Sequence, residues 1–223
     1  MKNTLINKLV RKIPFLYSYK LKKVYNYCFP IRGQNNKVIG CCGGGKLRII
    51  GNNNIVELNN CFMDNIPITI YGNNNHVIIN ENVKIFGGNI YITGSECLIK
   101  IGKNTSIQGA HINAQEHNTS IVIGEDCMFS GNIVIRTSDS HPVYCMETGK
   151  RINEAKSVHI GNHVWLGVQV FVLKGCSIGN NSIIGTGSVV THDIPANSIA
   201  VGIPAKVIKN NVNWTKTFEE CNE

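Results

Sequence analysis

Charged and aromatic residues are scarce in this chain of 223 residues, at 16% and 7% of the sequence. Their place is taken by 22 glycines and by many asparagines, isoleucines and valines, which favour turns and strands over helices. No apolar run approaches the roughly 20 residues of a membrane span. The apolar stretch near Ile13–Tyr17 is too short for a secretion signal and contains Pro14. The composition therefore predicts one β-rich domain with a small appendage.

Cysteine occurs nine times but never in a metal-binding arrangement. The only adjacent pair is Cys41–Cys42, and the sequence has neither a CxxC motif nor a Cys/His cluster at the spacing of zinc ligands. This pattern predicts reduced thiols in a cytoplasmic protein that needs no metal for its activity.

The formal net charge of +8 comes from the N-terminal end. Residues 1–32 hold eight basic residues and no acidic one, whereas the remaining 14 basic and 14 acidic residues cancel. A basic segment on a neutral body indicates an anionic partner for that segment. A membrane surface or an acidic neighbour is favoured over nucleic acid, because the chain has no nucleic-acid recognition motif.

A period of six residues begins at Ile160 and predicts the fold. The branched aliphatic residues at its first position are Ile160, Leu166, Val172, Ile178, Ile184 and Val190. Four of the six are followed by glycine, and the fifth position of each hexad is mostly small. Helices and ordinary strands have periods of 3.6 and 2, whereas a triangular solenoid has one strand and one corner per hexad. We therefore expect a parallel β-helix with coils of about 18 residues.

Residues 38–135 carry a looser form of the same repeat. Ile50–Asn54 and Tyr71–Asn75 have the same pattern of a large residue, glycine and three asparagines, 21 residues apart. These segments predict slightly longer coils with asparagine in the turns, where it tolerates left-handed backbone. A binding role for the asparagine runs is the less favoured alternative.

Residues 136–158 interrupt the period with polar and charged residues. A solenoid accommodates such an insertion as a loop that projects from one side, and loops of this kind often carry function. We expect a basic helical segment over residues 1–32, a β-helix domain over 33–211 with this loop, and a helical tail over 212–223. The N-terminal segment has three open roles: capping the open coil, contacting other copies, or attaching to a membrane surface.

The motifs after residue 120 resemble those of the hexapeptide-repeat acetyltransferases. They are Ser140-His141-Pro142, Ile160–Gly167, Ile184–Thr191, Asp193-Ile194-Pro195 and Val201–Lys209. The likeness is greatest to the maltose and galactoside acetyltransferases and to those that O-acetylate capsules, O-antigens and sialic acid. It implies a left-handed β-helix, a homotrimer with active sites between subunits, and acetyl-CoA as the donor.

The resemblance implies that His141 is the general base. An imidazole titrates near neutrality, so it can take the proton of an attacking hydroxyl and pass it to the departing thiolate. Asp139 or a backbone carbonyl is expected to orient the ring, and Trp165 is expected to form an aromatic wall at the acceptor site. His159 and His163 are less favoured as catalytic residues.

Acetyl-CoA is expected along the C-terminal coils. Small residues there let a ligand approach the main chain, and cations attract its phosphates. The positions implied by the resemblance are Gly167, Gly185, Thr186, Gly187, Ser188, Thr191, His192, Lys206 and Lys209. His192 departs from the lysine that is common in relatives, which puts one phosphate or adenine contact in doubt.

The leading hypothesis is O-acetylation of a sugar of a capsular polysaccharide, an O-antigen or a related glycan, close to the inner face of a membrane. An amine acceptor on the same fold is the main alternative. Less favoured are a scaffold without catalysis and a metalloenzyme resembling carbonic anhydrase, with His111, His117 and His141 as ligands. The acceptor sugar and the acyl chain length are not determined by these motifs.

Overall fold

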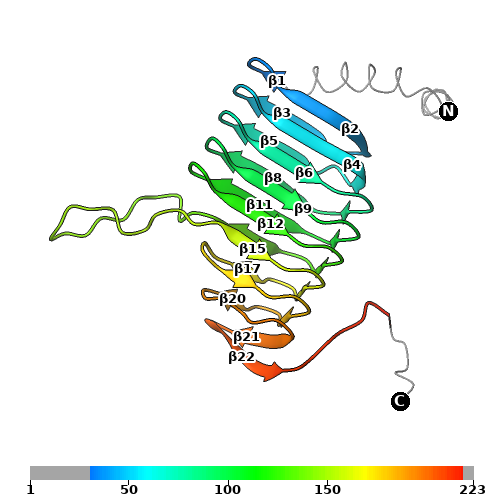
Figure 1. Cartoon of the computed structure of the whole chain (residues 1–223), viewed down its shortest axis with the longest axis vertical. Helices are drawn as coiled ribbons and strands as arrows, with labels where there is room; N and C mark the ends of the chain where they lie inside the picture. The colour runs from blue at the N-terminus through cyan, green and yellow to red at the C-terminus, as the bar shows by residue number, and fades with distance from the viewer. Residues whose placement is uncertain (1–30, 218–223) are drawn as a thin grey trace.

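The computed structural model describes residues 31–217, with only the backbone of residues 41–43. Over this range the chain forms the left-handed parallel β-helix that the repeat and the resemblance predict. Successive strands follow the three sides of a prism, and each strand pairs with the strand one coil away (Figure 1). The described residues contain no helix.

The three sides of the prism are called faces 1, 2 and 3. Face 1 consists of β1 (Ile31–Arg32), β3 (Lys46–Ile50), β5 (Pro67–Tyr71), β8 (Gly88–Thr93), β11 (Ala110–Gln115), β14 (Ile133–Arg136), β17 (Phe171–Val172) and β20 (Val189–Val190). Face 2 consists of the first half of β2 (Lys37–Gly43), whose end pairs on face 3, the first half of β4 (Ile55–Met63), β6 (His76–Ile79), β9 (Leu98–Ile101), β12 (Ser120–Ile123), β15 (Val158–Ile160) and β18 (Ser177–Ile178). Face 3 consists of the second half of β4, β7 (Lys84–Ile85), β10 (Ser106–Ile107), β13 (Met128–Phe129), β16 (Trp165–Leu166), β19 (Ile183–Ile184), β21 (Ser198–Gly202) and the antiparallel β22 (Ala205–Asn210).

Branched aliphatic residues from all three faces fill the prism. The six first-position residues of the repeat, from Ile160 to Val190, are fully buried, as the period predicts. Coil length differs along the axis: Ile68 pairs with Ile90, 22 residues on, whereas Trp165 pairs with Ile183, 18 residues on. The longer upstream coils expected from the looser repeat are therefore confirmed.

Asparagines of the upstream coils lie at the corner between faces 1 and 2, called corner 1–2. Asn53 and Asn74 adopt φ of 56°, as expected for turn asparagines. Asn54 and Asn75 are buried, and Asn75 Nδ2 donates to Asn54 Oδ1 and to the carbonyl of Gly94, both at 3.0 Å. The asparagine runs thus satisfy backbone groups inside the corner, where an unpaired group would be costly.

This column of side-chain hydrogen bonds continues along corner 1–2 through Cys97 and Thr119 to Thr137. Cys97 N donates to Asn75 Oδ1 at 2.9 Å, and Thr137 Oγ1 lies 3.3 Å from Thr119 Oγ1. Thr137 Oγ1 also donates to the carbonyl of Gln115 at 3.0 Å. The column therefore reaches the residue at which the repeat is interrupted.

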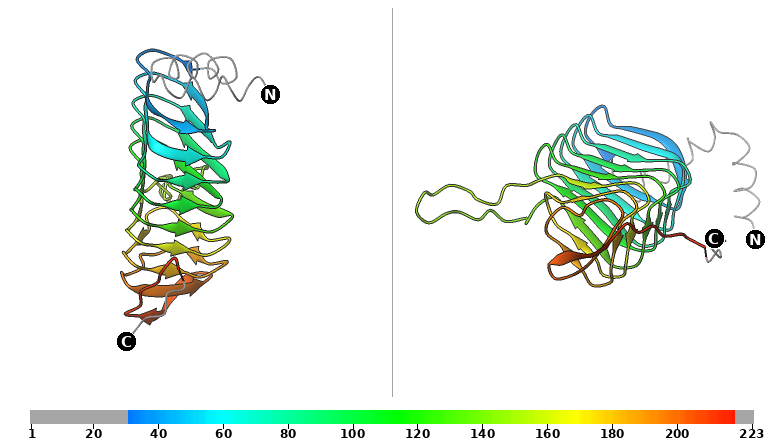
Figure 2. Two further views of the ribbon diagram at one scale, coloured as in Figure 1. Left: turned by 90° about the vertical axis from the view of Figure 1, so that its right-hand side faces the viewer. Right: turned by 60° about the horizontal axis from the view of Figure 1, so that its bottom comes forward.

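Residues 137–157 project from corner 1–2 as a loop, close to the predicted bounds (Figures 1 and 2). A bridge between Tyr144 and Arg151 joins its two arms. The coil resumes directly afterwards, because Ile121 of β12 pairs with Val158 of β15, 37 residues on.

The expected C-terminal helix is wrong over residues 212–217. This segment is irregular and runs back along the prism, because Trp214 and Lys216 make specific contacts with upstream coils. The helical segment expected over residues 1–32 lies, up to residue 30, outside the described residues, as does the tail from residue 218. No helix in the described range is long and apolar enough to cross a bilayer.

Candidate active site

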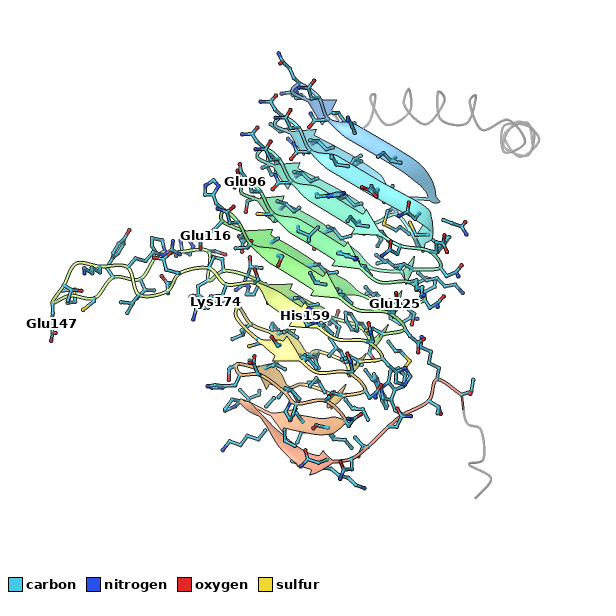
Figure 3. The ribbon with its side chains drawn as sticks, in the orientation of Figure 1. Glu96, Glu116, Glu125, Glu147, His159 and Lys174 are labelled. Carbon is cyan, nitrogen blue, oxygen red and sulfur yellow. The ribbon has the colours of Figure 1, made fainter. Side chains whose placement is uncertain are left out.

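An ion pair fastens the base of the projecting loop to the preceding coil. Arg151 donates from Nη1 and Nη2 to the two carboxylate oxygens of Glu116, at 2.7 and 2.8 Å. Ser138 Oγ also donates to Glu116. The hydrogen bonds from Arg151 are the main reason that the pKa of Glu116 lies below its ordinary value of 4.5. A bidentate pair of this kind fixes geometry as well as adding stability. Figure 3 shows Glu116 beside the base of the loop and Glu147 at its tip.

Asn153 connects the second arm of the loop to the first. Its Nδ2 donates to Asp139 Oδ2 at 2.9 Å and to the carbonyl oxygen of His141 at 2.8 Å. Lys174 Nζ donates to the carbonyl oxygen of Asn153 at 2.8 Å and also to Asp139 Oδ2. The hydrogen bond from Lys174 holds the pKa of Asp139 below its ordinary range. The main chain at His141 is thus held by a network that includes the next coil.

The imidazole of His141 is exposed and has no hydrogen-bond partner among the described residues. Ser140, which precedes it, has φ of 69°, a left-handed conformation that changes the direction of the main chain just before the histidine. The carboxylate of Asp139 contacts Asn153 and Lys174, so within one chain it does not orient the ring as expected. A fixed main chain carrying a free imidazole suits a proton acceptor for a substrate outside the prism.

Trp165 and His141 lie on different sides of one chain. His141 belongs to the loop at corner 1–2, whereas Trp165 opens β16 on face 3, which does not include that corner. Trp165 is half-buried, and its Nε1 is inaccessible to solvent with no hydrogen-bond partner in residues 31–217. A single chain therefore does not bring the expected base and the expected aromatic wall together.

Trp214 is a residue at this site that the sequence did not indicate. It is 7% exposed, and its ring centroid lies 5.9 Å from that of Trp165 and 4.1 Å from that of His163, on which it stacks. Trp214 Nε1 donates to the carbonyl of His163, and His163 Nε2 contacts the carbonyl oxygen of Trp214, both at 2.8 Å. Both ring nitrogens of His163 are therefore engaged in contacts within the chain.

An acidic residue completes the attachment of the C-terminal segment. Asp126 Oδ2 lies 2.7 Å from His163 Nδ1, and Asp126 Oδ1 accepts a hydrogen bond from Lys216 Nζ. Burial alone would raise the pKa of Asp126, but hydrogen bonds from Lys216 and His163 keep it below its ordinary value. The segment that carries Trp214 is thus held by both charge and ring stacking.

The residues expected to bind acetyl-CoA fall into three groups. Gly167 and Gly185–Ser188 lie at the corner between faces 3 and 1, Thr191 and His192 lie at corner 1–2, and Lys206 and Lys209 are exposed on β22. Thr191 Oγ1 and His192 Nδ1 are hydrogen-bonded to each other at 2.8 Å. These residues are thus spread over the coils that follow the loop, called the lower coils, and they do not form one pocket.

The glycines of this run have different roles. A Cβ on Gly167 would lie 2.7 Å from Thr186 N, and one on Gly185 would lie 2.6 Å from Val201 Cγ1, so both are required by the stacking of coils. Gly187 has φ of 72° and open space where a Cβ would be. Buried Ser188 accepts a hydrogen bond from Gly202 N at 3.0 Å. Gly187 is therefore the position where a ligand can best approach the main chain.

No cluster of three or more His, Cys, Asp or Glu side chains within residues 31–217 of one chain is arranged to hold a metal ion. His111 is hydrogen-bonded to Asn89 Oδ1 at 2.6 Å, and His117 Nδ1 accepts from Ser95 N at 3.3 Å. These two side chains are therefore engaged in contacts along the coils.

Comparison with known proteins identifies the family. Residues 157–192 match the family described as bacterial transferase hexapeptide (six repeats). A polysialic acid O-acetyltransferase of Neisseria meningitidis is 39% identical over 171 residues, which cover 76% of this chain and 79% of that protein. The chain belongs to the hexapeptide-repeat acetyltransferases.

Other hexapeptide-repeat acetyltransferases are also similar to this chain, both in sequence and in structure. A polysialic acid O-acetyltransferase of Escherichia coli O1:K1 / APEC is 39% identical over 142 residues; the match covers 64% of this chain but only 45% of that relative. Among solved structures, the polySia specific acetyltransferase NeuO has a TM-score of 0.75 at 36% identity, covering 84% of this chain and 88% of that one. The polysialic acid O-acetyltransferase OatWY has a TM-score of 0.77 at 36% identity, covering 85% and 92%.

Proposed function

We propose that this chain transfers an acetyl group from acetyl-CoA to a hydroxyl of sialic acid in an acidic capsular polysaccharide, with His141 as the general base. The observation that carries the proposal is the exposed imidazole of His141, without a protein partner in the described chain, on a main chain held by Asn153 and the Glu116–Arg151 pair. The likeness to two polysialic acid O-acetyltransferases supports the acceptor. Because both relatives are O-acetyltransferases, a hydroxyl acceptor is favoured over an amine.

The proposed reaction is a direct transfer. The imidazole of His141 takes the hydroxyl proton while the sugar oxygen attacks the thioester carbonyl carbon. The carbon–sulfur bond then breaks, and the imidazolium gives the proton to the leaving thiolate, which departs as CoA. A thioester is already activated, so no covalent acyl-enzyme is needed.

The donor fits the lower coils. Gly187 leaves its main chain open to a pantetheine arm, and the exposed amines of Lys206 and Lys209 are suited to attract phosphates. His192 is exposed at the position where relatives commonly have lysine, and here it is paired with Thr191. We propose that this pair replaces the missing lysine as a hydrogen-bonding contact.

The complete site requires more than one copy of the chain. Since His141 and Trp165 lie on different sides of one prism, a cleft that contains both combines the loop of one copy with face 3 of another. We propose a homotrimer with three such clefts, which closed symmetry permits. Location at the inner membrane surface stays a prediction that rests mainly on residues outside the described range.

The test measures release of CoA thiol from acetyl-CoA with polysialic acid, a neutral glucan and an amino sugar as acceptors. We expect turnover with polysialic acid, and a loss of at least about a hundredfold in His141→Ala, the usual contribution of a general base. His159→Ala is the matched control, because His159 is an exposed histidine on face 2. Near-normal turnover by His141→Ala, or turnover only with the amino sugar, would contradict the proposal.

Mixing two inactive variants tests the shared cleft. Copies with His141→Ala and copies with Trp165→Ala, unfolded and refolded together, will form some clefts that have both native residues. Activity is expected to reappear in the mixture and to be absent in each variant alone. No recovery in verified mixed oligomers would show that one chain supplies both residues.

A further inference from the structure

Face 1 above the loop carries positive but no negative charge. The six strands of this part, from β1 to β14, contain Arg32, Lys46, Arg48 and Arg136 but no Asp or Glu. In β3, β5 and β8 the buried aliphatic residues alternate with outward residues, which are mostly polar or aromatic. The face is therefore a cationic surface with aromatic side chains.

Two tyrosines and an arginine on this face are packed against one another. The rings of Tyr71 and Tyr91 meet edge to face with centroids 6.0 Å apart. Arg48 lies above the ring of Tyr71, with its guanidinium carbon 5.4 Å from the centroid. Each ring is half-buried, and Arg48 is exposed. Cation–π contacts of this kind hold a guanidinium in place while leaving its donors available.

Unsatisfied polar atoms lie on the same face, next to the loop. Asn113 of β11 and Arg136 of β14 are partners in register, and Arg136 is the last residue before the loop. Asn113 Oδ1 and Arg136 Nε have no hydrogen-bond partner in the described chain, although neither is accessible to solvent. Buried polar atoms without a partner are uncommon, so this end of face 1 has hydrogen-bonding capacity that the described chain leaves unused.

These groups form a continuous path. Arg48, Thr69, Tyr91, Asn113 and Arg136 occupy one register row across five adjacent strands. At about 4.8 Å per strand the row extends about 19 Å. Its lower end reaches the coil from which the loop with His141 projects.

We propose that face 1 is an extended binding site for an acidic polysaccharide chain, which runs from Arg48 across Tyr71 and Tyr91 to Arg136 and delivers one sugar to His141. This rests on the proposed function and deepens it, because it assigns the binding of a polymer to the N-terminal coils. Guanidinium groups match carboxylates in bidentate geometry, and aromatic ring faces pack against the C–H surfaces of sugars. A single sugar would reach only the lower end, so the upper residues matter only for long acceptors.

The experiment compares long-chain polysialic acid with a sialic acid dimer as acceptors. The variants are Arg48→Gln and the double variant Tyr71→Ala/Tyr91→Ala. Matched controls are Lys100→Gln on face 2 and Phe62→Ala on face 3, since Lys100 and Phe62 are exposed residues of similar type. Melting temperature and oligomeric state verify that each variant is folded.

The KM for the polymer is expected to rise about fivefold in Arg48→Gln, which loses one contact of about 1 kcal/mol, and about thirtyfold in the tyrosine variant, which loses two. The kcat with the polymer, and both constants with the dimer, should stay within about twofold of wild type, because the chemistry at His141 is untouched. The salt dependence of the polymer KM should weaken in Arg48→Gln.

Three outcomes would overturn the proposal. The first is an unchanged polymer KM in both variants, and the second is an equal loss with polymer and dimer. A change of oligomeric state in Arg48→Gln would also overturn it, because it would show that a second copy of the chain covers this face.

Binding separates this proposal from the proposed function. Full-length His141→Ala protein should bind fluorescent polysialic acid, and the binding should weaken when Arg48→Gln is added. If the protein binds the polymer in this way but wild type transfers no acetyl group to it, the proposed function fails alone. If it does not bind, the face 1 site fails whatever the reaction.

Discussion

The coils before the projecting loop and the coils after it differ in how they build corner 1–2. Upstream, buried asparagine, cysteine and threonine side chains form a column of hydrogen bonds from Asn54 to Thr137. Downstream, coils of 18 residues place buried Cys176 at this corner, and its Sγ lies 3.5 Å from the carbonyl oxygen of Val190. The upstream corner is therefore built around a chain of buried side-chain amides and hydroxyls, whereas the downstream corner has a thiol and the exposed carboxylate of Asp193, which accepts from Ser177 N. The loop projects at the change from one to the other.

The two parts of the prism therefore have different roles. The upstream column gives the loop a rigid base, whereas the downstream coils leave main chain open at Gly187. We therefore expect changes at the junction to affect catalysis, changes at the downstream surface to affect the acceptor wall, and changes within the column to affect stability alone.

The largest effect is expected at the junction, from Glu116→Gln. Removing the charge breaks the pair with Arg151 and frees the base of the loop. The kcat should fall by at least about tenfold, because a misplacement of about 1 Å can cost up to about a hundredfold. Steady-state kinetics measure this, and Glu125→Gln, an exposed residue paired with Lys103 on the far side, is the control.

The same pair predicts a dependence on pH. The pKa of Glu116 is lowered in the folded chain, so the contribution of the pair is complete above the ordinary value of 4.5 and is lost as pH falls through the lowered pKa. Proteolysis of the loop should therefore increase in acid well below pH 4.5 in wild type. In Glu116→Gln it should already be fast at neutral pH, and equal resistance of the two proteins would contradict this role.

An intermediate effect is expected from Trp214→Ala. The indole supports Trp165 and His163 but touches no reacting group, so the KM for the acceptor should rise by about threefold to fivefold, the equivalent of about 1 kcal/mol. The kcat and the KM for acetyl-CoA should change little. Trp214→Phe, which keeps a ring but loses the indole N–H, should recover most of the difference. An equal rise in the KM for acetyl-CoA would indicate a general disturbance of the lower coils.

The smallest effect on activity is expected from Asn75→Ala. It leaves Cys97 N and the carbonyl of Gly94 without the partners that Asn75 supplies, at about 1–3 kcal/mol for a buried unsatisfied group. The melting temperature should fall by several degrees, while activity at low temperature stays within about twofold. Cys176→Ala makes the corresponding change at corner 1–2 downstream and should cost less, because the thiol makes only a long contact with the carbonyl oxygen of Val190. A larger loss for Cys176→Ala would contradict the contrast between the two parts.

Much of the fold could be predicted because its information is local. The six-residue period marks the inward positions from Ile160 to Val190, and all of them are buried. The asparagine runs marked the turns, and the interruption marked the loop. The hand of the coil came from the family resemblance, because a period does not contain it.

The site was predicted less completely, because its support is non-local. His141 was indicated by its motif, but the network of Glu116, Arg151, Asn153 and Lys174 joins three coils and has no sequence pattern. Trp214 lies 51 residues from His163, and the tail that carries it was expected to be helical. Periodicity does not show such contacts, since they depend on where an irregular segment returns to the prism.

The pairing of Ile121 with Val158 has a consequence for how this enzyme can change. Because these two residues pair directly, the stacking of the coils does not depend on the length of the loop between β14 and β15. Residues 137–157 can therefore become longer or shorter without a shift in the register of any strand. Closing a longer loop costs little, since each doubling of its length adds only about 0.6 kcal/mol. Exchange of this one segment between relatives can therefore change the length and side chains of the loop in a single step, while the coils on either side stay as they are.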